Sequence, residues 1–211
     1  IVMVTNMFRD ASEAWDMGTQ RAEMNTAARA AVEYIARELQ SAIAGPIDTV
    51  VPSAAAYLPF QLDNEGLKFC VLDETPGGST RAMRGVLFYH VPEPECRLMY
   101  NRISDTSING YKNILIINQS GSALLITNVW RFEVNIYSNE SDMISGAPPP
   151  SSYNSSVLPA AVDISIEMLG ERDMARALSL PSGLKRDGYV MTNSRVYTAR
   201  VCFPNRGGSG R

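Results

Sequence analysis

The sequence is poor in the side chains on which most catalytic and metal sites depend. Its 211 residues include one histidine, His90, and three cysteines, none of them in a CxxC pair. Zinc sites are built from closely spaced cysteine and histidine ligands, so the composition argues against one. The glycine patterns that hold phosphates, GxGxxG and GxxxxGK(S/T), are also missing. We therefore assign no catalytic, cofactor-binding or metal-ligating residue, and we expect His90 to be an ordinary strand residue.

Long hydrophobic runs and clusters of basic charge are missing as well. No segment reaches the roughly 18 consecutive apolar residues that indicate a transmembrane helix. Lys and Arg total 19 against 22 Asp and Glu, a formal net charge of −3, and they form no basic block. Nucleic acid is therefore not an expected partner. The hydrophobic content of 45% is that of a globular protein with a core.

The three cysteines allow two interpretations. Cys70 and Cys96 lie at the edges of strand-like segments and could form a disulfide in an oxidising compartment. Alternatively, Cys70, Cys96 and Cys202 are three buried free thiols, which behave as small apolar side chains. The sequence leaves both interpretations open.

What the sequence does contain is one long helical segment, residues 1–44. It has no proline and one interior glycine, Gly18, and Gly45-Pro46 follows it as a stop signal. Small or apolar residues recur every three or four positions, the spacing of one helix face. They are Val4, Phe8, Ala11, Trp15, Gly18, Ala22, Asn25, Ala28, Val32, Ile35, Leu39 and Ala42. At about 1.5 Å per residue this helix is roughly 65 Å long, more than a compact domain needs.

We expect the two halves of this helix to differ. Residues 1–24 should protrude, whereas residues 25–211 should form a globular head that includes the second half of the helix. The helix positions expected to be buried are Ala28, Val32, Ile35, Leu39 and Ala42. The positions assigned to an exposed assembly interface are Val4, Phe8, Ala11 and Trp15. The alternative is an ordinary amphipathic helix that lies wholly on a sheet.

The rest of the chain alternates strand-like segments with turns. In residues 130–137 apolar side chains occupy the even positions and polar ones most of the odd positions, which predicts one buried and one solvated face. Residues 85–91 and 96–102 are expected to form a hairpin across Pro92-Glu93-Pro94-Glu95. Residues 123–137 as a whole form the clearest strand-like stretch. Strands or short apolar runs are also expected at 67–72, 113–118, 158–168 and 194–203, the last with Val196 and Val201 as apolar anchors.

The connections are expected to be irregular. Residues 48–59 should be a surface connector, 63–65 a turn, 138–157 a long polar loop, and 170–188 a mixed, charged connection. One long helix followed by strands predicts an α+β fold, in which the C-terminal half of the helix packs on one or more antiparallel sheets.

Three of these segments resemble those of type IV pilin-like proteins. The helix, with Phe8, Trp15 and residues 27–39, is similar to the second half of the pilin helix in the J-type minor pseudopilins of type II secretion and the W-type minor pilins. Residues 124–137 resemble a strand pair of these families, and Leu158-Pro159-Ala160-Ala161-Val162 resembles the start of a strand that follows a variable loop. Pilin-like proteins of verrucomicrobial gene cassettes are also similar. The family's N-terminal glycine, phenylalanine and glutamate pattern is not in this sequence.

The resemblance implies a structural, non-enzymatic subunit of a type IV pilus or type II secretion filament. Its partners would be other pilins or pseudopilins, bound through the N-terminal helix. The head would be periplasmic and anchored in the inner membrane before assembly, and would belong to a periplasmic or cell-surface filament afterwards. We expect Ile1 to Val4 to continue upstream into roughly 15–20 apolar residues, the membrane-embedded part of the helix. The alternative function is a cell-surface adhesin or ligand-binding β-domain on a helical stalk.

Overall fold

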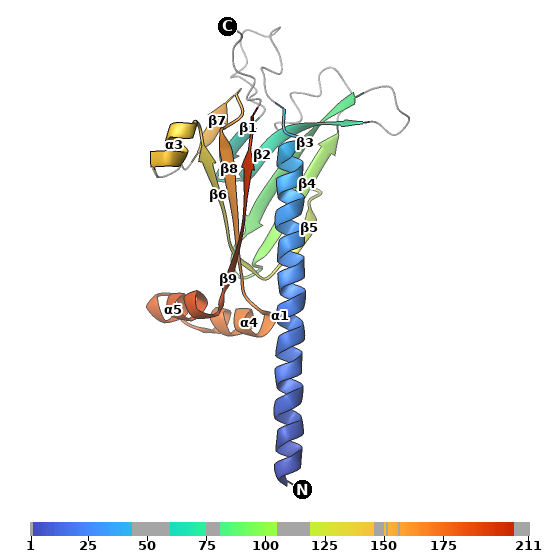
Figure 1. The fold of residues 1–211 in the computed structure, drawn as a ribbon, viewed down its shortest axis with the longest axis vertical. Coiled ribbons are helices and arrows are strands. Elements are labelled where there is room, and N and C mark those ends of the chain that lie inside the picture. The colour runs from blue at the N-terminus through green and yellow to red at the C-terminus, as the bar shows by residue number, and fades with distance from the viewer. Residues whose placement is uncertain are drawn as a thin grey trace.

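The computed structural model describes residues 2–43, 60–74, 81–104, 119–145, 150, 152–155 and 157–204. The fold is α+β, with a long N-terminal helix and two antiparallel sheets (Figure 1). This confirms the fold class that the sequence predicts.

Helix α1 spans Val2–Gln40. The first sheet consists of β1 (Phe60–Asp63), β2 (Gly66–Glu74), β3 (Arg81–Val91), β4 (Arg97–Ser104), β5 (Ala123–Thr127) and β7 (Tyr153–Ser155), in the order β5-β4-β3-β2-β1-β7. The second sheet consists of β6 (Val129–Tyr137), β8 (Ala161–Met168) and β9 (Arg195–Cys202), in the order β6-β8-β9. The described part of the head also contains the short helices α3 (Glu140–Ser145), α4 (Glu171–Ser179) and α5 (Leu184–Asn193).

The C-terminal half of α1 packs into the core that the two sheets share. Ala28, Val32, Ile35 and Leu39 are at most 5% exposed, as the sequence predicts. Ala42, which was also expected to be buried, is half-buried.

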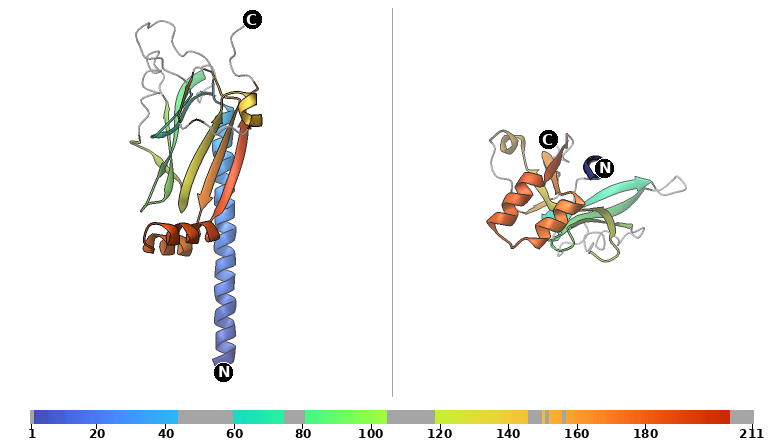
Figure 2. Two further views of the ribbon diagram at one scale, coloured as in Figure 1. Left: turned by 90° about the vertical axis from the view of Figure 1, so that its left-hand side faces the viewer. Right: turned by 90° about the horizontal axis from the view of Figure 1, so that it is seen from below.

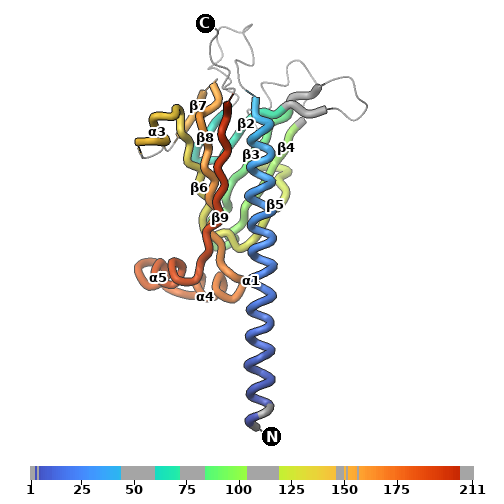
Figure 3. The backbone as a smooth tube through the Cα atoms, in the orientation of Figure 1, coloured from blue at the N-terminus to red at the C-terminus, as the bar shows by residue number. Residues whose placement is uncertain are grey.

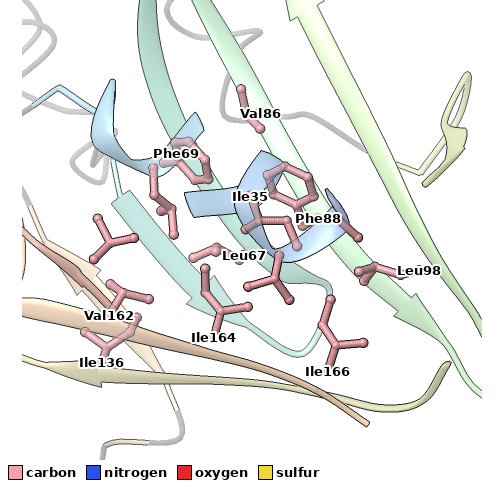
Figure 4. Packing of buried hydrophobic residues seen from close by; sticks show 14 of the residues in the cluster. Ile35, Leu67, Phe69, Val86, Phe88, Leu98, Ile136, Val162, Ile164 and Ile166 are labelled. Carbon is pink, nitrogen blue, oxygen red and sulfur yellow. The ribbon is translucent and has the colours of Figure 1, made fainter. Parts of the chain in front are cut away.

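Side chains of both sheets surround Ile35 (Figure 4). Leu67, Phe69 and Phe88 come from the first sheet, and Ile164 and Ile166 come from the second. Full burial of an aliphatic side chain contributes about 1.5–3 kcal/mol, so this half of the helix is an integral part of the core.

Aromatic and ionic contacts fix the orientation of α1 on the first sheet. The ring of Tyr34 makes edge contacts with Phe88 and Tyr100, with centroid separations of 6.2 and 5.4 Å. One turn further along the helix, the carboxylate of Glu38 lies 3.6 Å from the guanidinium of Arg102. The helix is therefore held by directional contacts as well as by apolar burial.

The helix ends four residues earlier than predicted because the chain joins the sheet. Ala42 forms a β-bridge with Val71, and the amide of Ile43 donates a hydrogen bond of 3.0 Å to the carbonyl oxygen of Cys70. Strand β1 covers β2 only as far as Phe69, which leaves this edge of β2 open to Ala42. The expected stop at Gly45-Pro46, the connector at 48–59 and the apolar run at 113–118 lie outside the described residues.

The alternation predicted for residues 130–137 is confirmed from Phe132 onward. Phe132, Val134 and Ile136 face the shared core, whereas Arg131 and Glu133 are exposed. Trp130 departs from the pattern because a β-bulge interrupts the pairing of β6 with β8 between Val129 and Arg131. Val129 enters the main core instead, and Trp130 packs on a second cluster under α4 and α5. The predicted hairpin is confirmed, since Val91 of β3 pairs with Arg97 of β4.

Other predictions were wrong in part. Residues 138–157 are not a loop throughout, because α3 lies within them and β7 pairs with β1. The connection at 170–188 contains α4 and the start of α5. Val201 is buried, but Val196 is 58% exposed. The two valines are an odd number of positions apart, so their side chains project from opposite faces of β9.

The cysteines form no disulfide, and they are not all buried. Cys70, Cys96 and Cys202 are free, and only Cys202 is exposed. Cys70 pairs with Gly85 in the middle of β3, whereas Cys96 directly precedes Arg97, which pairs with Val91 at the end of that strand. At about 3.3 Å per strand residue the two cysteines are roughly 20 Å apart, far beyond the 7 Å that a disulfide allows between Cα atoms. The suggested Cys70–Cys96 bridge is therefore ruled out by the β3 register.

Candidate functional site

The N-terminal half of α1 projects from the head as a bare rod (Figures 1 and 2). Every side chain from Thr5 to Thr19 is exposed. Phe8 and Trp15 are 75% and 77% exposed, as the sequence predicts. Ala11 is also exposed, and the side chain of Val4 lies outside the described residues. Large aromatic side chains held in water on one element mark an interaction surface.

The exposed aromatic side chains share one side of the rod. Successive residues of an α-helix are about 100° apart, which places Phe8, Ala11 and Trp15 within an arc of roughly 60°. Charged residues occupy other directions, and Arg9 and Glu13 lie 3.6 Å apart as an i,i+4 pair. We call the surface of Phe8, Ala11 and Trp15 the rod face.

The packed half of α1 explains how the rod can exist without its own tertiary contacts. Nucleating a helix is costly, but adding residues to an existing helix is not. The half that Ile35 and Leu39 hold in the core supplies that nucleus. The helix becomes partly buried at Met24 and Asn25. Met24 packs on the core, and Asn25 accepts a hydrogen bond from the hydroxyl of Tyr197.

A groove runs between α1 and the start of α4 where the rod leaves the head. Three adjoining cavities of about 230, 260 and 430 Å³ lie there, and Gly170, the residue before α4, lines all of them. Their shared lining joins them into one depression. Figures 1 and 3 show α4 beside α1 at this level, and Figure 2 shows α5 next to α4 in the view from below.

The largest cavity combines apolar and cationic walls. Its lining residues are Met17, Gln20, Arg21, Gly170, Arg172, Asp173, Arg176, Tyr189 and Asn193. We call this lining the α4 groove. Three arginines face one carboxylate here, so the groove is positively charged.

Two side-chain contacts join α4 to α5 in the wall of the groove. The hydroxyl of Tyr189 donates a hydrogen bond of 2.6 Å to Asp173, and the guanidinium of Arg176 lies 5.5 Å from the centre of the Tyr189 ring. The hydrogen bond to Asp173, together with burial, raises the pKa of Tyr189. Beneath them Cys96, Leu169, Met174, Ala177 and Val190 form the second apolar cluster.

Sequence reasoning missed this groove, although Met174, Ala177 and Leu178 have helical spacing.

The other candidate residues have structural contacts. The Nε2 atom of His90 lies 2.9 Å from the carbonyl oxygen of Val129, which ties β3 to the start of β6. Asp63 accepts hydrogen bonds from the amides of Glu65 and Gly66, which confirms the predicted turn at 63–65. The ammonium of Lys68, although buried, pairs with both Asp63 and Glu65.

In the described part of the chain, no group of His, Cys, Asp or Glu side chains is arranged to hold a metal ion. Within the same residues, no helix is both long and apolar enough to cross a bilayer. The chain matches no protein-family model, no curated protein and no solved structure. The rod face and the α4 groove are the candidate functional surfaces of the described residues.

Proposed function

We propose that this chain is a structural subunit of a type IV pilin-like filament, either a pilus or a type II secretion filament, and that it assembles through the rod. The observation that carries the proposal is the division of α1 into a packed half and a bare half with Phe8 and Trp15 on one side. The proposal also draws on the resemblance of α1, β5–β6 and the start of β8 to pilin-like sequences. The partners would be other pilins or pseudopilins.

The energetics favour a partner for the rod face. Burying one large apolar side chain contributes about 1.5–3 kcal/mol, and aromatic pairs add about 0.5–1.5 kcal/mol. Phe8 and Trp15 together thus supply several kcal/mol that only association can realise. In the proposed setting the head is outside the cytoplasm, is anchored in the inner membrane before assembly, and later enters the filament.

Association of the purified chain tests this proposal. Sedimentation velocity over a concentration series should show self-association that weakens at least tenfold in the Phe8→Ala/Trp15→Ala variant. The matched control is Leu184→Ala/Met191→Ala, which removes two apolar side chains of α5 that are 92% and 82% exposed. The control should associate like the wild type. A wild-type chain that stays monomeric, or a control that loses as much association as the rod variant, would contradict the proposed function.

A further inference from the structure

The rod face and the α4 groove lie on opposite sides of the same helix. Met17 is nine positions after Phe8, and Met24 is nine positions after Trp15. Nine residues are two and a half helical turns, a rotation of about 180°. Met17 lines the largest cavity and Met24 lines the other two, whereas Phe8 and Trp15 point away from them. A subunit therefore cannot cover its own rod face with its own groove.

The groove and the rod are complementary in charge. The described rod residues before Gln20 carry Arg9, Asp10, Glu13 and Asp16, a net charge of −2. The charged residues of the largest cavity are Arg21, Arg172, Arg176 and Asp173, a net charge of +2. Among the described residues, Arg21, Arg172 and Arg176 form no ion pair with a carboxylate of their own chain. Asp173 is already bonded to Tyr189.

The groove is also large enough for an aromatic side chain. A cavity of about 150 Å³ accommodates a benzene ring. The largest of the three cavities measures about 430 Å³, with Met17 and Tyr189 in its wall. Asp16 lies about 100° round the helix from Trp15. An indole ring in the cavity would therefore place this carboxylate at the side of the contact, next to the arginines at the cavity rim.

We propose that the α4 groove binds the rod face of a second copy of this chain, with Trp15 in the largest cavity and Asp16 beside Arg172. The inference rests on the proposed filament function and assigns the receiving surface for the rod. Because the two surfaces face opposite directions, two copies cannot exchange rods reciprocally. The contact is heterologous, and each bound copy leaves one free rod face and one free groove, which gives an open assembly.

The same geometry sets the offset between neighbouring copies. Trp15 is the residue placed in the largest cavity, and the α1 residues that line this cavity, Met17, Gln20 and Arg21, are centred near position 19. At about 1.5 Å per residue, parallel docking displaces each copy by roughly 6–8 Å along the helix axis.

A charge-reversal cycle tests this contact in the full chain. Asp16→Arg and Arg172→Glu should each weaken self-association about fivefold or more, and the two changes combined in one chain should restore most of it. Both side chains are exposed, so melting of the monomer should not change. The control Lys185→Glu makes the same charge change as Arg172→Glu, but on α5 outside the groove. It should leave association intact. Single variants that behave like this control, or a double variant without recovery, would overturn the proposal.

Cysteine cross-linking separates failure of this inference from failure of the filament function. Thr192 lines the adjoining cavity of about 260 Å³. In a Cys202→Ala background, a Ser12→Cys chain and a Thr192→Cys chain should form a covalent dimer under mild oxidation only when the two are mixed. If the Phe8→Ala/Trp15→Ala variant loses association but this cross-link does not form, the rod binds elsewhere and only the groove assignment is wrong. If neither the cross-link nor association is seen, both proposals are wrong.

Discussion

The hydroxyl of Tyr197 on β9 donates a hydrogen bond to Oδ1 of Asn25 on α1, across 172 positions of the chain. Burial raises the pKa of Tyr197, so its hydroxyl keeps the proton that it donates. The bond marks the level at which the helix leaves the head. Toward the C-terminus α1 is buried between the sheets, and toward the N-terminus it is bare from Thr19 to Thr5.

This division predicts different effects of truncating the two halves of α1. Leu39 is fully buried, and Leu39→Ala should lower the free energy of unfolding by about 2–5 kcal/mol through the lost burial and the cavity left behind. Trp15→Ala should change it by less than about 0.5 kcal/mol, because the indole has no tertiary contact to lose. Thermal and denaturant unfolding of both monomers would measure the difference. Equal destabilisation would mean that the rod folds back onto the head.

Two glycines should respond in opposite ways to an added methyl group. Gly66 has φ +134°, and a Cβ there would lie 2.2 Å from the carbonyl oxygen of Phe88. Gly66→Ala should therefore destabilise the head by about 2–5 kcal/mol through backbone strain and overpacking. Gly18 lies in the rod with no atom within 4 Å of such a Cβ. Gly18→Ala should raise helicity by circular dichroism, since alanine is favoured over glycine by about 1 kcal/mol inside a helix. Loss of stability from Gly18→Ala would contradict a bare rod.

Stability should fall at alkaline pH because of a buried thiol. Burial raises the pKa of Cys70 from 9.0 to about 12. An unfolded chain therefore loses this proton at a lower pH than the folded chain does. The part of the free energy of unfolding that depends on the protonated thiol is fully present below pH 9 and is lost as the pH rises toward 12. By pH 11 the loss should be roughly 2–3 kcal/mol.

Unfolding free energies at pH 8 and pH 11 would test this assignment. The loss between the two pH values should be smaller in Cys70→Ala than in the wild type. Cys202 is exposed, so Cys202→Ala should leave the loss unchanged. Identical losses in the wild type and in Cys70→Ala would show that Cys70 carries no titrating buried thiol, as would be the case in a disulfide.

The elements that could be predicted from the sequence are those with long, regular patterns. The three- and four-residue spacing of α1 and the alternation in β6 each extend over many residues. The division of α1 also followed from its length, because the head is too small to cover it. The exposed aromatic residues of the candidate site, Phe8 and Trp15, could be identified for the same reason.

The missed elements depend on distant partners or on short patterns. Strand β7 has three residues and no apolar alternation, and it exists because β1 offers a free edge to Tyr153–Ser155. Helix α4 has nine residues, so only Met174, Ala177 and Leu178 reveal its spacing. The α4 groove combines α1 with residues about 150 positions later, and local sequence patterns carry no information on such a juxtaposition.

The emission spectrum of Trp15 tests the central claim most directly, that the rod is bare in the monomer and covered in the assembly. The chain has two tryptophans, so Trp130→Phe leaves Trp15 as the only reporter. We expect emission typical of a water-exposed indole, strongly quenched by acrylamide, in the dilute monomer. A blue shift and protection from the quencher should appear at the concentrations at which sedimentation detects association. A protected indole in the monomer, or an indole that stays exposed in the assembled state, would contradict the account.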